Sequence, residues 1–213
     1  MGEVYIIHGR ASHPNNSWFT WLANELQREG IRTHVPKMPN PYVPSMRKWV
    51  KKVREIAGKP SKDKYFIGHS LGCQAILRAF EGHQGEMYGG TVLVAPFHKI
   101  NLDGVLQETK ERLGRYSPSF LSKVVASLVI APVMKWCDVP LDWEAARKAS
   151  SEYSCVFSSN DHLVKKEEWK LFEDNLGARC HYLENGGHLN TRSGFTSLPE
   201  LKNITLEMIA GRK

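Results

Sequence analysis

Residues 68–72 read Gly-His-Ser-Leu-Gly and place a serine between two glycines, each two positions away. A short apolar run typical of a buried strand precedes this segment, and a helical pattern follows it. A serine on so sharp a turn takes a strained, positive φ, and its hydroxyl then projects from the sheet toward an incoming carbonyl carbon. Glycine is needed on both sides because side chains there would clash where strand and helix approach each other. Ser70 is therefore a candidate nucleophile.

A serine hydroxyl needs a general base near neutral pH, and the base needs a carboxylate that orients it and balances its charge. His188 follows a predicted strand at 179–183, within the sequence Gly-Gly-His-Leu-Asn, and Asp161 follows one at 154–158. The chain order serine, acid, histidine accompanies this type of turn. We predict that His188 is the base and that Asp161 is the acid.

Other residues compete for these roles. His162 is the rival base. It ranks below His188 because it adjoins Asp161 in the chain, and neighbouring loop residues rarely hydrogen-bond to each other through their side chains. Asp161 also fits a simpler role, as an Asx turn or a cap for the helix expected near residue 166. Three further acids remain as candidates, each less well placed: Asp142, Asp174 and Glu184.

An acyl-transfer site also needs N–H donors for the oxygen that becomes negatively charged. Leu71 begins the helix after the serine, so its amide and the positive end of the helix dipole point toward that oxygen. We expect the second donor in the loop after the first strand, where the amide of Arg10 is our choice and that of Ala11 the alternative. The Arg10 side chain either meets a substrate carboxylate or forms an ordinary salt bridge at the loop edge.

These residues must be positioned by the elements around them. Short apolar runs predict strands at residues 4–7, 31–35, 64–67, 91–95, 154–158 and 179–183. Helical patterns lie between them and at the C-terminal end. Strands that are apolar throughout and alternate with helices indicate a six-stranded, mostly parallel sheet with helices on both faces. In such α/β folds, functional residues lie in loops at the C-terminal ends of strands, where all three candidates fall.

A helical insertion is expected after the fourth strand, at about residues 100–150 of a single domain that spans residues 1–213. Apolar residues at helical spacing form a stripe within it: Phe120, Leu121, Val124, Val125, Leu128 and Val129. The stripe fits either a cap above the strand ends or a helix packed on the sheet. If it is a cap, Trp136 and Trp143 are expected to line an apolar acyl pocket.

Composition, net charge and cysteine spacing limit the class of protein. With 213 residues, 41% of them hydrophobic, the chain is long enough for a sizeable core. The net charge is +7, and several of the basic residues fall on one face of a predicted helix: Arg47, Lys48, Lys51, Lys52 and Arg54. We interpret this face as solvated because no nucleic-acid-binding motif accompanies it. Four cysteines without metal-site spacing indicate reduced thiols and a cytoplasmic protein. We expect no metal, no cofactor, no signal peptide and no membrane span.

The chain resembles the small serine hydrolases of the bacterial YdeN and retinoblastoma-binding-protein-9 type. The segments that carry the resemblance are residues 4–9, 18–22, 38–41, 68–73, 142–144, 159–161 and 186–190. The resemblance implies a reduced α/β-hydrolase fold that lacks the first two strands of the larger enzymes. It also implies that Ser70, Asp161 and His188 form the catalytic triad of a carboxylic-ester or amide hydrolase.

We therefore predict a metal-free, carboxylesterase-like serine hydrolase. Its expected partner is a small-molecule ester or amide with a short to medium acyl chain, which reacts through an acyl-enzyme. Two alternatives use the same scaffold. One is a non-catalytic protein-interaction module, and the other is an acyltransferase that uses the same triad.

Overall fold

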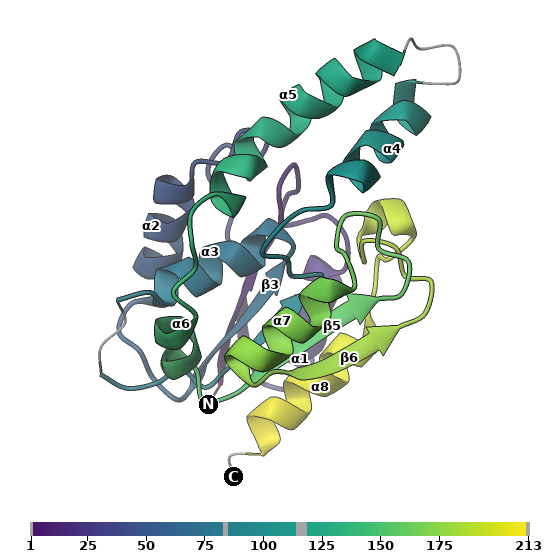
Figure 1. Cartoon of the computed structure of the whole chain (residues 1–213). Helices are drawn as coiled ribbons and strands as arrows, with labels where there is room; N and C mark the ends of the chain where they lie inside the picture. Colours follow the sequence, from purple (N-terminus) through teal and green to yellow (C-terminus); the bar gives the residue numbers. More distant parts are fainter. Residues whose placement is uncertain (1, 83–84, 114–118, 212–213) are drawn as a thin grey trace.

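A six-stranded sheet forms the centre of the computed structural model, which describes residues 2–82, 85–113 and 119–211 (Figure 1). The strand order is β2-β1-β3-β4-β5-β6, and every neighbouring pair runs parallel. The strands are β1 (Glu3–Ile7), β2 (Arg32–His34), β3 (Lys64–His69), β4 (Gly90–Val94), β5 (Tyr153–Ser158) and β6 (Arg179–Leu183). The predicted parallel sheet is confirmed.

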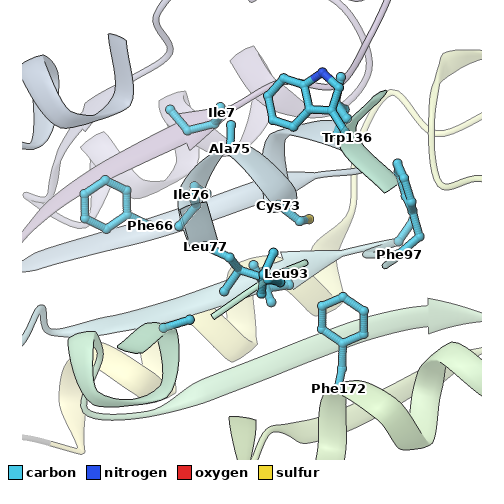
Figure 2. Close-up of a cluster of buried hydrophobic side chains, with 14 of the residues drawn as sticks. Ile7, Phe66, Cys73, Ala75, Ile76, Leu77, Leu93, Phe97, Trp136 and Phe172 are labelled. Atoms are coloured by element: carbon cyan, nitrogen blue, oxygen red, sulfur yellow. The ribbon is translucent and has the colours of Figure 1, made fainter. Parts of the chain in front are cut away.

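Helices cover both faces of this sheet. Alternate residues of a strand point to opposite faces, so Val4 and Ile6 of β1 face one helical layer while Tyr5 and Ile7 face the other. The layer beside Val4 contains α1 (Phe19–Arg28) and α8 (Pro199–Ala210). The opposite layer contains α2 (Met46–Ala57), α3 (Leu71–Phe80), α6 (Trp143–Ala149) and α7 (Glu167–Leu176). Figure 2 shows part of this second core, where apolar side chains of α3 gather with those of β3, β4 and α7.

The expected insertion lies between β4 and β5 and begins with α4 (Leu102–Leu113) and α5 (Ser119–Cys137). The two helices pack against each other and extend beyond the end of the sheet (Figure 1). Helix α5 extends past Val129, the last residue of the apolar stripe, and contains Pro132. The part of the expected insertion at residues 114–118 lies outside the described part of the chain.

The apolar stripe of α5 does not pack on the sheet as a unit. Leu121, Val124 and Leu128 are exposed, and Leu128 keeps 72% of its surface accessible. The inner face of α5 instead buries Ala126, together with Ile130, Val133 and Trp136 nearer its C-terminal end. The side chains of Phe120 and Val129 lie outside the described part. Within the described residues, every helix is too short or too polar to cross a bilayer.

A buried arginine fixes the far end of the insertion. Arg78 of α3 is 2% exposed, and its guanidinium donates to the backbone carbonyls of Trp136, Val139 and Pro140 at 2.8, 2.6 and 3.0 Å. These carbonyls lie at and just beyond the C-terminal end of α5, where a helix leaves carbonyl groups without intrahelical partners. The arginine therefore ties the end of α5 to the helix that follows Ser70.

Candidate active site

Ser70 lies on the predicted sharp turn between β3 and α3. Its φ of 54° and ψ of −121° fall in a region that side chains disfavour. The flanking glycines are required sterically: a Cβ on Gly68 would lie 2.8 Å from the Cys73 backbone, and one on Gly72 would lie 2.2 Å from the Ile7 carbonyl oxygen. The close approach of backbones thus leaves room only for glycine on both sides of the serine.

The structure brings the three predicted side chains together. His188 Nε2 lies 2.9 Å from Ser70 Oγ, and His188 Nδ1 lies 2.8 Å from Asp161 Oδ2. A carboxylate only accepts, so Nδ1 carries the proton and Nε2 is left to accept the serine hydroxyl proton. The histidine and aspartate side chains are 6% and 2% exposed, which shields their pairing from water. This arrangement has the connectivity of a nucleophile, a base and an orienting acid.

Two side chains that the sequence did not single out for this role hold the loop that carries His188. His69 Nε2 donates to the His188 carbonyl oxygen at 3.0 Å, and Trp18 Nε1 donates to the Leu189 carbonyl oxygen at 2.9 Å. Burial lowers the pKa of His69 to about 3, so its ring stays neutral at ordinary pH. The one available signal was the position of His69, at the end of an apolar strand and beside the nucleophile.

The loop after β1 lies beside Ser70, as expected for an oxyanion donor. A Cβ on Gly9 would lie 3.0 Å from Ser70 Cβ. Buried His8 fixes this loop, since its Nδ1 donates to the Gly9 carbonyl at 2.8 Å and its Nε2 accepts from the Met38 amide at 3.0 Å. Burial lowers the pKa of His8, which favours the neutral ring that this pair of bonds needs. The amide of Ala11 donates to the Pro41 carbonyl at 2.8 Å and is thus already used.

The competing residues have other partners. His162 Nε2 lies 3.5 Å from Glu108 Oε2, and this hydrogen bond raises the pKa of His162. The three other candidate acids bind elsewhere: Asp142 caps α6 through the Ala145 amide, Asp174 pairs with Lys170, and Glu184 accepts from Ser159 Oγ. Each competing side chain thus has a partner other than Ser70 or His188.

A cavity of about 520 Å³ opens at Ser70 and His188. Its apolar wall comes mainly from the insertion and the neighbouring loops: Phe97, Ile100, Val105, Ile130, Val133 and Leu163. Its polar wall includes Arg10, Asn16 and Arg192. Within the described residues, no group of three or more His, Cys, Asp or Glu side chains is arranged to hold a metal ion.

The two tryptophans predicted to line an acyl pocket lie elsewhere, so this prediction is corrected. Trp136 is fully buried in the core, edge-on to Trp49, and donates to the Pro44 carbonyl oxygen at 3.3 Å (Figure 2). Trp143 packs against the rings of His98 and Phe172. The smaller aliphatic residues of α4 and α5 take the place in the cavity that the tryptophans were expected to fill.

Comparison with known proteins gives consistent matches over nearly the whole chain. The sequence model of a family described as serine hydrolase matches residues 4–135 and 140–206. YdeN of Bacillus subtilis is 27% identical over 203 residues, which cover 95% of this chain and 93% of YdeN. The crystal structure of YdeN matches with a TM-score of 0.82 at 25% identity, over 99% of this chain and 100% of the other.

Two further solved structures share the fold at lower identity. A structure from work on carboxylesterases of Nitrososphaera gargenis has a TM-score of 0.67 at 14% identity, over 98% of this chain and 90% of that chain. Est1E from Butyrivibrio proteoclasticus, with ferulic acid bound, has a TM-score of 0.66 at 15% identity, over 99% and 90% of the two chains. The α/β-hydrolase fold expected from the sequence is thus confirmed, with the helical insertion after β4.

Proposed function

Because the chain belongs to the serine hydrolase family, we propose that it cleaves small carboxylic esters or amides through a covalent acyl-enzyme. Ser70 is the nucleophile, His188 the general base and Asp161 the orienting acid. The observation that carries this proposal is the position of His188, whose two ring nitrogens lie 2.9 and 2.8 Å from Ser70 Oγ and Asp161 Oδ2.

The proposed reaction has two halves. Ser70 Oγ attacks the substrate carbonyl carbon while His188 Nε2 takes the hydroxyl proton, and the imidazolium then gives that proton to the leaving alcohol or amine. Water repeats the attack on the acyl-enzyme, with His188 again as base, and Ser70 is released. Asp161 orients His188 in both halves and stabilises the imidazolium.

We assign the oxyanion to the backbone amides of Leu71 and Arg10. Leu71 is the first residue of α3, so its N–H lies at the positive end of the helix dipole. Arg10 is favoured over Ala11 because the Ala11 amide already donates to the Pro41 carbonyl. Backbone donors are fixed before the reaction, so they stabilise the developing charge without reorganisation.

The cavity supports substrates with short to medium acyl chains. Its volume of about 520 Å³ is in the usual range for small-molecule sites, and its aliphatic wall suits a hydrocarbon chain. Among these residues, Ile130 and Val133 belong to α5, so the insertion contributes to acyl selection.

We keep the prediction of a cytoplasmic location, since all four cysteines are free thiols.

The test uses a fluorophosphonate probe and p-nitrophenyl acetate on wild-type protein, Ser70→Ala and Ser127→Ala. Ser127 is an exposed serine of α5 and serves as the matched control. We expect labelling and hydrolysis in the wild type and the control, and loss of labelling with a fall in turnover of about 10³-fold or more in Ser70→Ala. Equal turnover in Ser70→Ala and wild type removes Ser70 from the mechanism.

The same assay separates the alternatives. A folded wild-type protein that the probe does not label favours the interaction module. Product analysis with an added alcohol distinguishes hydrolysis, which gives the free acid, from acyl transfer, which gives a new ester.

A further inference from the structure

The first helix of the insertion lies directly on the loop that carries Asp161. The Asn101 backbone N–H donates to the Leu163 carbonyl oxygen at 2.9 Å, and its side-chain amide donates to the His162 carbonyl oxygen at 2.9 Å. A Cβ added to Gly104 would lie 1.6 Å from that His162 oxygen, far inside the contact distance of about 3.5 Å. The α4 backbone therefore meets the loop with no side chain between them.

Glu108 extends this contact by one helical turn. Its Oε2 lies 3.5 Å from His162 Nε2 and its Oε1 lies 3.0 Å from Arg192 Nη1. Asn101 lies immediately before α4, and positions 101, 104 and 108 follow the three- and four-residue spacing of one helix face. His162 directly follows Asp161, and Arg192 belongs to the segment after His188. One face of α4 therefore touches both chain segments that supply the acid and the base.

The position of the Asp161 carboxylate depends on this same short loop. Its Oδ1 accepts from the Leu163 amide at 2.9 Å, while its Oδ2 faces His188. Leu163 is thus bonded on both sides, through its N–H to Asp161 and through its carbonyl to Asn101. A displacement of residues 162–163 moves the carboxylate away from His188.

We propose that Asn101, Gly104 and Glu108 are positioning residues, which hold Asp161 toward His188 from the start and one face of α4. The insertion is then a fixed support of the catalytic site at this end, in addition to a wall of the cavity. This inference rests on the proposed function, since the loop affects turnover only if Asp161 orients His188.

Gly104→Ala separates local helix stability from the position of the loop. Gly104 has no positive φ, so alanine suits the helix backbone better than glycine does. Its methyl group nevertheless forces α4 and the loop apart. We expect kcat to fall by about 100-fold, as for misplacement of a catalytic group by about 1 Å, with KM nearly unchanged.

Glu108→Gln is the second variant, because it keeps the side-chain size and removes the negative charge that faces His162 and Arg192. Its expected effect is a smaller fall in kcat, of roughly tenfold, and it keeps the test decisive if Gly104→Ala does not fold. Lys110→Ala, on an exposed position of the same helix, is the matched control and should behave as the wild type. Circular dichroism and thermal melting establish that each variant is folded.

The kinetic pattern decides the matter. A loss of kcat without a change in KM supports the inference, whereas a change confined to KM shows that α4 contacts only the substrate and overturns it. Folded Gly104→Ala and Glu108→Gln with wild-type kcat overturn it as well. A folded wild type without fluorophosphonate labelling at Ser70 refutes the proposed function and this inference together, while normal labelling with unaffected variants refutes this inference alone.

Discussion

Asp161→Asn is the sharpest test of the triad, because the structure fixes how the new amide must lie. Asp161 Oδ1 accepts the Leu163 N–H at 2.9 Å, and only oxygen can keep that bond, so the asparagine NH₂ group must face His188 Nδ1. His188 then presents an unprotonated Nδ1, and its proton moves to Nε2, the atom that has to accept the proton of Ser70. The wrong tautomer lowers kcat by about 10⁴-fold, or about 5.5 kcal/mol of transition-state stabilisation.

The assay is steady-state hydrolysis of p-nitrophenyl acetate, with thermal melting to establish folding. Asp142→Asn is the matched control: Asp142 caps α6 through the Ala145 amide at 2.9 Å, and asparagine caps a helix as well as aspartate does. We expect this control to retain wild-type activity. A folded Asp161→Asn protein within about tenfold of wild-type kcat contradicts the tautomer argument and leaves the orienting role without a residue.

Two further predictions concern stability. Because burial lowers the pKa of His69 to about 3, the unfolded chain binds a proton below pH 6.5 that the folded chain does not, so acid reduces the free energy of unfolding. We therefore measure the free energy of unfolding by urea denaturation between pH 6.5 and pH 4. Its slope against pH should be smaller by about 1.4 kcal/mol per pH unit in His69→Asn than in wild type, and equal slopes contradict the lowered pKa of His69. Arg78→Met removes bonds to three carbonyls and should lower the free energy of unfolding by about 3 kcal/mol in the same assay, whereas an unchanged midpoint excludes the tethering role.

The strands, and the proximity of three side chains that are distant in the sequence, can be predicted from short segments of the chain. Apolar strands identify the parallel sheet, and the carboxyl ends of parallel strands meet at one edge, so residues that follow β3, β5 and β6 converge. The glycines around Ser70 add a steric requirement that is visible within five residues. Its position after a strand favours Asp161 over Asp142 as the acid, but the sequence leaves open a simpler role for Asp161, as an Asx turn or a helix cap.

What the sequence could not predict depends on contacts between distant segments. Trp136 is buried because α5 passes the loop at Pro44 and meets Trp49, and helical periodicity does not specify which face of α5 does so. Gly104 gave no signal either, since a glycine within a helix shows no sign of the loop it contacts at His162. The support that His69 gives to the His188 carbonyl is a third such contact.

The backbone angles at Ser70 place its proposed catalytic role in conflict with thermal stability. A non-glycine residue in such a conformation costs of the order of 1–3 kcal/mol, and this cost falls on the residue that we propose as the nucleophile. Directed evolution that screens for heat resistance alone favours glycine at this position and so removes the proposed nucleophile. A screen of this enzyme for durability therefore has to score turnover in every round.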